Sequence, residues 1–397
     1  MRILFVSPAA ELGGAERCLL DCIVALQESS VAVEVGLIAL ADGPLVQQAR
    51  ARGVETQVIK LPNELAELGE SGGQRASALV ALIFMTTKAA PFLAELRRAI
   101  NRVRPDVVHT NGMKAHLLAG MLAPSQARLA VHLHDFIGAR RASKWLLPAL
   151  ARVRRRIVFI ANSRAVADDF ARLAPGADVR TVYNVVDTDY FCPGSADSAW
   201  LAREAGLDPA EDAISFGLVA TYACWKGHAL FIEAAGLLRA AHPALPLRFY
   251  VVGGPIYKTL GSQVQASELL DRARIAQIER CFGLVPFQDD IARVYRSLSV
   301  VVHASTQPEP FGRTIIEGMA CERPVVVARA GGAAELFQDG ENALGYEPGN
   351  ATALANAMAA MLDPGLRARL GRSARNHVVR DFGRSRLAPE LLGAYTA

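Results

Sequence analysis

Two glutamates eight residues apart flank a turn that leads into a predicted helix. The segment reads Glu309-Pro310-Phe311-Gly312-Arg313-Thr314-Ile315-Ile316-Glu317, and the helix is predicted over residues 314–320. Backbone N–H groups at such a helix start can hold a phosphate, because they have no partners within the helix and lie at the positive end of its dipole. The two carboxylates can accept hydrogen bonds from ribose and hexose hydroxyls. The spacing therefore predicts a site for a sugar joined to phosphate; the alternative is a surface loop with incidental acids.

Two further segments follow predicted strands and can contact a diphosphate. Lys226, after the predicted strand 214–220, suits a leaving diphosphate, whose negative charge grows as the sugar departs. Gly13 and Gly14 precede a predicted helix over residues 17–27, and adjacent glycines let backbone N–H groups approach an anion closely. Their spacing is not that of the G-x-G-x-x-G motif, which disfavours a dehydrogenase. An ordinary solvated lysine and a plain tight turn remain the alternatives.

The secondary-structure elements that would position these residues can be predicted from the sequence. Short runs of β-branched residues alternate with helical patterns, and this alternation is typical of parallel sheets with crossover helices. Near-continuous hydrophobicity indicates that the strands are buried on both faces. We therefore predict an α/β fold of two Rossmann-like, doubly wound domains, with ligands at the carboxyl ends of the strands. The predicted strands are residues 3–6, 33–39, 55–59, 106–110, 129–133, 157–161, 179–183, 214–220, 247–253, 280–284, 300–303 and 324–328.

A segment rich in Asp, Gly, Pro and Ser, residues 187–212, separates the two series of strands. We predict an N-terminal, acceptor-binding domain over residues 1–187 and a C-terminal, nucleotide-sugar-binding domain over residues 188–380. The last segment, residues 381–397, is predicted to form a helix that packs back on the first domain. Two such domains facing each other would enclose a deep cleft.

The positive charge of the chain is concentrated in one region. The formal net charge is +4, and residues 97–156 hold 13 basic residues against 2 acidic ones. This imbalance predicts an anionic partner (membrane lipid, a lipid-phosphate acceptor or the donor itself) or else a solvated basic face. Nucleic acid is not expected, because no recognition motif accompanies the charge.

The expected location is the cytoplasm, with or without peripheral contact at the inner membrane surface. The best membrane candidate, residues 78–85, is far shorter than the roughly 18 residues that a spanning helix needs. The N-terminal apolar run is too short for a signal-peptide core. The six cysteines contain no C-x-x-C pair, which fits reduced thiols better than disulfides or a zinc site.

The sequence resembles the retaining nucleotide-sugar glycosyltransferases of glycosyltransferase family 4, which have the two-domain GT-B fold. The resemblance extends over nearly the whole chain, and its specific mark is the E-x7-E segment from Glu309 to Glu317 with its E-P-F-G start. Several less specific motifs occur in the order expected for the family. They are Gly13-Gly14-Ala15-Glu16, Asp106-Val107-Val108-His109, Asn184-Val185-Val186-Asp187, Trp225-Lys226-Gly227, Gly253-Gly254-Pro255, Gly331-Gly332-Ala333-Ala334-Glu335 and Asp339-Gly340-Glu341-Asn342.

The resemblance implies a role in donor binding for each matching residue. Glu309 would hold hydroxyls of the transferred sugar near the reacting carbon, and Glu317 would bind the ribose. Lys226 would neutralise the diphosphate, and Gly14 would touch it from the opposite domain. Thr221, also in the predicted donor site, stands where many relatives have an arginine that contacts the diphosphate. Further donor contacts would come from Phe311, Gly312, Arg313 and Thr314, and from Leu284 beside the nucleobase.

The acceptor side is predicted at the ends of two strands in the first domain. His134 corresponds to a histidine that lies near the transferred sugar in relatives, where it could relay a proton or hydrogen-bond a hydroxyl. The alternative is a core or capping histidine. The predicted acceptor contacts are His109, Asn111 and Lys114, and the predicted catalytic residues are Glu309, His134 and Lys226.

The predicted function is transfer of a hexose-type sugar from a nucleotide-diphosphate sugar to a hydroxyl acceptor, with retention of configuration through front-face substitution. The acceptor is lipid-linked or soluble, and the product would belong to cell-surface polysaccharide or glycolipid biosynthesis. No metal or other cofactor is expected, because no D-x-D triplet has a convincing metal-binding context. Two alternatives remain open: a nucleotide-sugar epimerase of the same fold and a catalytically silent nucleotide-sugar-binding protein.

Overall fold

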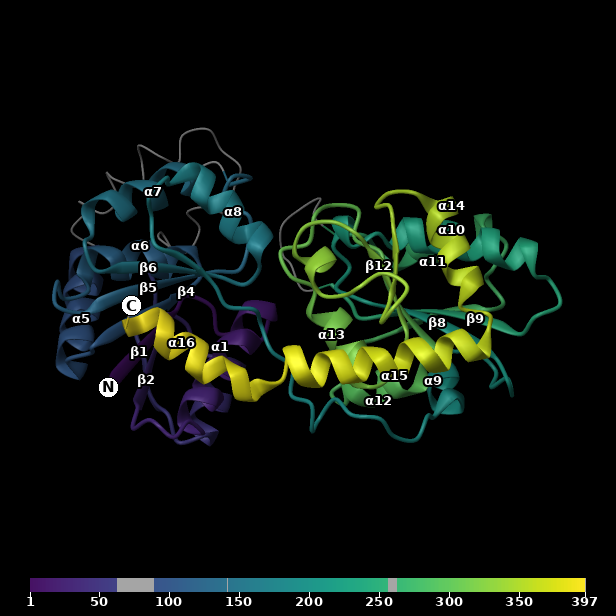
Figure 1. Cartoon of the computed structure of the whole chain (residues 1–397), viewed down its shortest axis with the longest axis horizontal. Coiled ribbons are helices and arrows are strands. Elements are labelled where there is room, and N and C mark those ends of the chain that lie inside the picture. Colours follow the sequence, from purple (N-terminus) through teal and green to yellow (C-terminus); the bar gives the residue numbers. More distant parts are fainter. Residues whose placement is uncertain (63–88, 141, 256–262, 397) are drawn as a thin grey trace. The chain divides into compact units, whose positions relative to one another are not determined.

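The chain forms two compact units, each built on one parallel sheet (Figure 1). The structure is a computed structural model that describes residues 1–62, 89–140, 142–255 and 263–396. Unit 1 contains Met1–Val185 and Arg384–Ala397, and unit 2 contains Val186–Gly383. The predicted α/β fold with two Rossmann-like domains is confirmed. The apolar run 78–85 and Arg141 lie outside the described residues.

Unit 1 contains a sheet of seven strands in the order β3-β2-β1-β4-β5-β6-β7. Neighbouring strands all pair in parallel, which requires a crossover connection after each strand. The strands are β1 (Arg2–Ser7), β2 (Glu34–Ala39), β3 (Glu55–Val58), β4 (Val107–Asn111), β5 (Arg128–Leu133), β6 (Ile157–Ala161) and β7 (Val179–Thr181).

Helices cover both faces of this sheet. Successive side chains of β1 point to opposite faces: Leu4 and Val6 join one buried cluster, and Ile3 and Phe5 join the other. The first cluster is covered by α5 (Ala89–Val103), α6 (Met113–Leu122), α7 (Ser143–Val153) and α8 (Arg164–Leu173). The second is covered by α1 (Gly14–Gln27), α2 (Pro44–Ala51) and the C-terminal helix α16 (Leu387–Thr396).

Unit 2 contains a sheet of six parallel strands in the order β10-β9-β8-β11-β12-β13. Every strand predicted from the sequence is present. The structure adds β13, a three-residue edge strand that is too short to show a hydrophobic pattern. The strands are β8 (Ile214–Val219), β9 (Leu247–Val252), β10 (Phe282–Val285), β11 (Val300–His303), β12 (Val325–Ala328) and β13 (Leu344–Tyr346).

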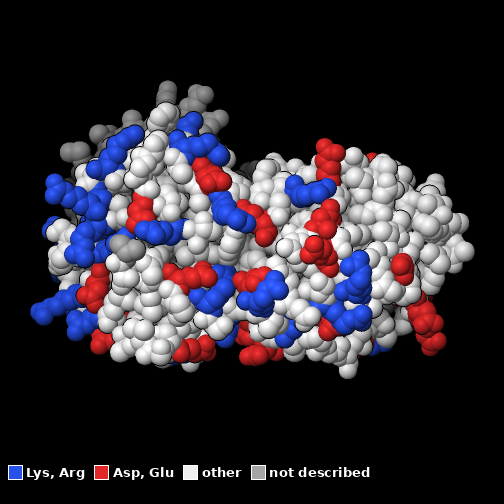
Figure 2. Space-filling model, in the orientation of Figure 1, with Lys and Arg blue, Asp and Glu red and all other residues white. Residues whose placement is uncertain are grey.

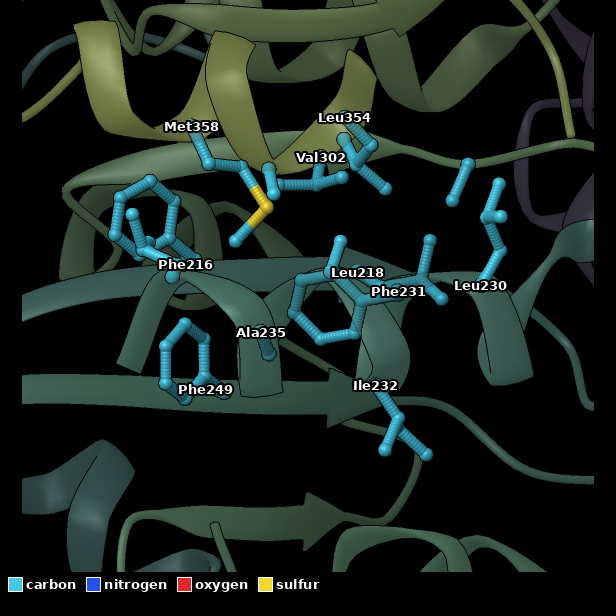
Figure 3. Packing of buried hydrophobic residues seen from close by; sticks show 14 of the residues in the cluster. Phe216, Leu218, Leu230, Phe231, Ile232, Ala235, Phe249, Val302, Leu354 and Met358 are labelled. Carbon is cyan, nitrogen blue, oxygen red and sulfur yellow. The ribbon is translucent and has the colours of Figure 1, made fainter. Parts of the chain in front are cut away.

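One buried cluster of unit 2 lies between the sheet and a first helical layer. Figure 3 shows Phe216 and Phe249, from adjacent strands, together with Phe231 of α10 and Met358 of α14. This layer consists of α10 (His228–Ala241), α11 (Ala266–Ile275) and α14 (Ala351–Ala360). The other layer consists of α9 (Ser198–Glu204), α12 (Ile291–Ser297), α13 (Arg313–Ala320) and α15 (Pro364–Asp381) (Figure 1).

The strand order of each sheet contains one point at which the direction of winding reverses. In unit 1 this switch point lies between β1 and β4, and in unit 2 it lies between β8 and β11. Open parallel sheets bind ligands in the crevice outside the carboxyl ends of the strands at this point. The topology therefore selects the loops after these four strands as candidate binding loops. No helix in the described part of the chain is long and apolar enough to cross a bilayer.

Candidate active site

A polar cluster in unit 2 surrounds the carboxylate of Glu309. Lys226 Nζ donates to both carboxylate oxygens at 2.8 Å, and Ser305 Oγ donates to Oε2 at 2.7 Å. His303 Nε2 lies 3.5 Å from the same oxygen. The two residues predicted to be catalytic in this unit thus form one partly buried ion pair.

The sheet topology of unit 2 brings Lys226 and Glu309 together. Lys226 ends the 3₁₀ turn η1 (Cys224–Lys226), which follows β8, and Glu309 lies in the loop after β11. These two strands are parallel neighbours, so their carboxyl ends meet at the same edge of the sheet. The sheet reverses its winding between them. The ion pair therefore occupies the place where this kind of sheet binds ligands.

Two glycines allow the loops to approach this closely. Gly227 has φ +74°, and a Cβ there would lie 1.8 Å from the carbonyl oxygen of Ala304. Gly331 has φ +62°, and a Cβ there would lie 2.5 Å from the carbonyl oxygen of Glu309. The N–H of Gly332 donates to that same oxygen at 2.7 Å. Larger residues at these glycines would move the backbone that carries Lys226 and Glu309.

The surroundings of Glu309 keep its carboxylate ionised. Burial by itself raises the pKa of this carboxyl, but the Lys226 ammonium and then His303 lower it. The result is a pKa well below the ordinary value. Glu309 is therefore an acceptor of hydrogen bonds at neutral pH and a poor proton donor.

The second glutamate of the segment, Glu317, is held inside unit 2. Its Oε2 accepts a hydrogen bond from the Tyr295 hydroxyl at 2.9 Å, and its Oε1 lies 3.4 Å from Arg313 Nε. Tyr295 is fully buried on α12, and burial, followed by the charge of Glu317, raises the pKa of its phenol well above the usual value. The tyrosine thus stays a neutral donor that fixes one oxygen of Glu317. Sequence reasoning missed Tyr295, because no short motif connects it to a glutamate 22 residues later.

The start of α13 lies between the two glutamates. Gly312 occupies the cap position with φ +106°, and no side chain makes a capping hydrogen bond there. Phe311 is buried, whereas Arg313 and Thr314 are partly buried. An uncapped helix start next to an ionised carboxylate and a lysine can hold a phosphate beside a sugar.

In unit 1 the neighbouring strands β4 and β5 bring three histidines together: His109 on β4, His132 on β5 and His134 directly after β5. His134 Nε2 lies 2.5 Å from Asn111 Oδ1, and the rings of His132 and His134 are 4.1 Å apart. His132 Nδ1 lies 3.1 Å from His109 Nε2, and His109 Nδ1 lies 2.7 Å from the Tyr395 hydroxyl. A row of contacts, three hydrogen bonds and one ring–ring contact, therefore runs from Asn111 to the C-terminal helix.

This row changes the role expected for His109. The side chain is buried, and burial, followed by the charge of His134, lowers its pKa to about 3. Because both ring nitrogens already have protein partners, His109 does not fit the predicted contact with the acceptor. Its Nε2 instead contacts Nδ1 of His132. Of the other predicted residues, Asn111 is buried behind His134, while His134 and Lys114 are partly exposed.

The glycine pair of unit 1 lies at the start of α1. A Cβ on Gly14 would meet nothing within 4 Å, so the backbone there is open to a ligand. A Cβ on Gly13 would lie 2.8 Å from Glu16 Oε2. Burial raises the pKa of Glu16, and hydrogen bonds from the N–H groups of Glu16 and Gly13 oppose this effect. A diphosphate approaching Gly14 would thus meet the Glu16 carboxylate, a neighbour that sequence reasoning did not consider.

Sequence profiles of known families match both units. The family described as "Glycosyltransferase Family 4" matches residues 12–190, and the family described as "Glycosyl transferases group 1" matches residues 213–364. The two stretches do not overlap, and together they take in more than four fifths of the chain. The chain belongs to glycosyltransferase family 4.

Individual relatives agree with this family. A D-inositol 3-phosphate glycosyltransferase of Acidothermus cellulolyticus is 33% identical over 223 residues, which are 55% of this chain and 47% of the relative. A protein of the same name from Catenulispora acidiphila is 35% identical over 246 residues, or 60% and 55% of the two chains. The chain spans about half the length of the curated relatives it matches.

Solved structures place the family 4 chain in the GT-B fold. HepE of Anabaena, solved with UDP and glucose, has a TM-score of 0.79 and 24% identity, and all of both chains is covered. Sucrose-phosphate synthase of Thermosynechococcus elongatus has a TM-score of 0.77 and 17% identity, with 99% of this chain and 98% of the other covered. The predicted GT-B architecture is therefore confirmed.

The family 4 resemblance also predicts donor contacts at Thr221 and Leu284. Thr221 follows β8, and its hydroxyl is buried without a hydrogen-bond partner among the described residues. Leu284 lies on β10, the edge strand two places away from β8 in the sheet. A buried hydroxyl without a partner calls for a ligand or a water molecule, which keeps Thr221 a predicted contact of the donor.

Within the described ranges, no three His, Cys, Asp or Glu side chains are grouped as metal ligands. In the described part of the site, the positive groups near the E-x7-E segment are Lys226 and Arg313, each paired with one of the two glutamates.

Proposed function

We propose that this protein transfers a hexose-type sugar from a nucleotide-diphosphate sugar to a hydroxyl acceptor. The observation that carries the proposal is the Lys226–Glu309 ion pair at the switch point of unit 2, beside the uncapped start of α13. The names and ligands of similar proteins support it. HepE was solved with UDP and with UDP-glucose, and the sequence relatives are named glycosyltransferases.

The ion pair suggests how a donor would be received. A diphosphate carries more negative charge than a carboxylate, so it competes for the Lys226 ammonium. Once Lys226 turns to the diphosphate, both oxygens of Glu309 can accept hydrogen bonds from the sugar hydroxyls. Lys226 and the start of α13 then stabilise the charge that grows on the leaving diphosphate. Removal of one such group costs about 10²–10³-fold in kcat at comparable sites.

We propose retention of configuration by front-face substitution. With the donor bound, Glu309 would accept hydrogen bonds from Ser305 and from the sugar hydroxyls, and we assign it this role in place of that of a covalent nucleophile. The acceptor hydroxyl would attack from the side of the leaving diphosphate. The anomeric proton coupling in the NMR spectrum of the product tests this directly, and a glycosyl group trapped covalently on Glu309 would refute it.

The finer features of the reaction belong to the same proposal. The acceptor would bind near His134 and Lys114 in unit 1, and would be a lipid-linked saccharide of cell-surface polysaccharide or glycolipid synthesis. The protein would work in the cytoplasm, in peripheral contact with the membrane. Catalysis would need no metal, because Lys226 and a helix start supply positive potential. EDTA should therefore leave the initial rate unchanged, whereas a metal-dependent enzyme would lose activity.

The decisive experiment is a screen of UDP-, GDP-, ADP- and TDP-sugars by thermal shift and by slow hydrolysis. At a concentration about 100 times Kd, a bound donor adds about 2.7 kcal/mol to the stability of its site. The Glu317→Ala variant should lose both the shift and the hydrolysis, and the exposed-site control Glu279→Ala should keep both. No shift with any donor would reject the proposal. Release of an altered free nucleotide sugar without an acceptor would indicate an epimerase instead.

A further inference from the structure

Helix α7 of unit 1 presents large apolar side chains to the solvent. Its inner side buries Leu147 against the sheet, as expected for a helix of an α/β layer. On its outer side Trp145 is 71% exposed, Leu146 40% and Val153 81%. The helix therefore has a second apolar face that no other part of its unit covers among the described residues.

The end of α6 lies next to α7 and carries a further exposed apolar side chain. A Cβ on Gly120 would lie 2.7 Å from the Leu150 side chain, so the last turn of α6 packs against α7. Arg154 fastens the two helices, because its guanidinium donates to the carbonyl oxygens of Gly120 and Ala123. Met121, in this last turn of α6, is 61% exposed. We name Met121, Trp145, Leu146 and Val153 the α7 surface.

The segment of the chain that contains α7 is strongly basic. Residues 136–156 contain seven basic residues and no acidic one. Lys144 lies 5.4 Å from the ring of Trp145. Figure 2 shows Lys and Arg gathered over the part of unit 1 that contains α5 and α7. Among the described residues, no carboxylate pairs with the four basic residues that accompany the surface, which are Lys144, Arg152, Arg155 and Arg156.

We propose that the α7 surface docks on an anionic lipid bilayer. A tryptophan and aliphatic side chains on one face of a short helix can enter the boundary between head groups and acyl chains, while lysine and arginine contact the anionic head groups. Basic residues without a described carboxylate partner, placed around exposed apolar side chains, match a negatively charged head-group layer over an apolar one, which favours the bilayer as the occupant. This inference refines the membrane contact proposed above. Lipid binding is measured without donor or acceptor, so it can fail while sugar transfer stands.

Co-sedimentation of the full chain with vesicles tests the charge contribution. Vesicles of equal parts phosphatidylglycerol and phosphatidylcholine should bind the protein, and vesicles of phosphatidylcholine alone should bind it far less. Each basic residue near an anionic surface contributes about fivefold to the partition coefficient at low salt. The test variant combines Arg152→Gln, Arg155→Gln and Arg156→Gln. Neutralisation of these three arginines should lower the partition coefficient on the order of 100-fold.

A matched control removes the same charge from unit 2. Substitution of three exposed arginines changes the net charge by the same amount. These arginines lie outside the α7 surface, so lipid binding should persist. The control substitutions are Arg203→Gln, Arg274→Gln and Arg372→Gln. An equal loss of binding in both triple variants would overturn the proposal, because net charge alone would then explain the binding.

The apolar contribution is tested in the same assay. Trp145→Ala together with Val153→Ala should weaken binding at least tenfold and remove most of the blue shift of tryptophan fluorescence on vesicles. The control, Ile275→Ala, truncates an 83% exposed residue on α11 and should change neither quantity. Unchanged binding by the Trp145/Val153 variant would refute the proposal.

A dimer that forms without lipid and that this variant abolishes would also refute the proposal, because the α7 surface would then bind a second copy of the chain. A thermal unfolding curve like that of the wild type verifies folding of each variant.

Discussion

At the scale of single residues, the candidate site contains an ion pair that the proposed donor would have to open. Lys226 donates to both oxygens of Glu309, and Ser305 adds a third hydrogen bond. In the absence of donor this arrangement satisfies the charge of both partners. A donor that replaces it supplies a diphosphate for the lysine and hydroxyls for the carboxylate, so neither group is left buried without a partner.

The depressed pKa of Glu309 predicts a pH-dependent contribution to stability. A carboxyl whose pKa is lower in the folded state stabilises the protein above its unfolded pKa of about 4.5, and this contribution is lost as the pH falls toward the folded pKa. Between pH 7 and pH 3 the wild type should therefore lose about 1–2 kcal/mol more stability than Glu309→Gln. Urea unfolding over this pH range measures the difference. Parallel curves for the two proteins, with Glu279→Gln as a surface control, would contradict the assignment.

At the scale of elements, the turn η1 sets the position of Lys226. The N–H of Thr306 donates to the carbonyl oxygen of Trp225 at 2.9 Å, which ties η1 to the loop after β11. Gly227 follows directly and adopts a left-handed conformation against Ala304. The lysine is therefore placed by backbone contacts between two loops and not by its own side chain.

Gly227→Ala should displace Lys226. The new Cβ would lie 1.8 Å from the carbonyl oxygen of Ala304, in addition to the strain of a positive φ. Gly206→Ala is the matched control, because Gly206 has φ +70° in the same unit and nothing within 4 Å of its Cβ position. We expect a loss of about 1 kcal/mol in the control, from the backbone strain alone. Gly227→Ala should lose at least 2 kcal/mol more and also lose donor binding. Chemical denaturation measures both losses of stability. If the two variants lose equal stability, the close contact between residue 227 and Ala304 does not position Lys226.

Helix α12 positions Glu317 of α13 through the hydroxyl of Tyr295. Tyr295→Phe removes only the hydroxyl that donates to Glu317 Oε2. The loss of one such hydrogen bond is worth about 1–1.5 kcal/mol, so KM or Kd for the donor should rise about 5–15-fold. The value of kcat should change little, because the ribose lies away from the reacting carbon. The control is Tyr250→Phe, a buried tyrosine on β9. A fall in kcat with unchanged donor affinity would contradict a positioning role.

At the scale of the whole molecule, the chain returns to unit 1 after completing unit 2. Helix α16 buries Leu387, Leu391 and Tyr395 in the core on one face of the first sheet. Tyr395 also contacts His109, 286 residues earlier in the sequence. The stability of unit 1 therefore depends on the last residues of the chain, whereas unit 2 is continuous in sequence.

Deletion of residues 387–397 should destabilise unit 1 selectively. Exposure of two leucines and a tyrosine costs roughly 5 kcal/mol, which is comparable to the stability of an ordinary domain. Hydrogen exchange should show lost protection in β1, β4 and α1. Protection in β8 and β11 should persist, and the nucleotide-sugar should still bind. Equal loss of protection in both units would show that they do not fold as separate units.

The sequence by itself determined the fold class and all the described strands except β13, and it predicted Lys226, Glu309 and Glu317 as residues of the candidate donor site. This was possible because strand burial, helix periodicity and the E-x7-E spacing are local properties of the chain. Only the tertiary structure decided which side chains are partners. Lys226 and Glu309 are 83 residues apart, and their contact follows from the adjacency of β8 and β11, which no local pattern specifies. The same reason explains why Tyr295 and Tyr395 were missed, and why the burial of His109 between Tyr395 and His132 was not predicted. Strand order and helix packing bring distant segments together, so the contacts of a site can be read only after the chain has folded.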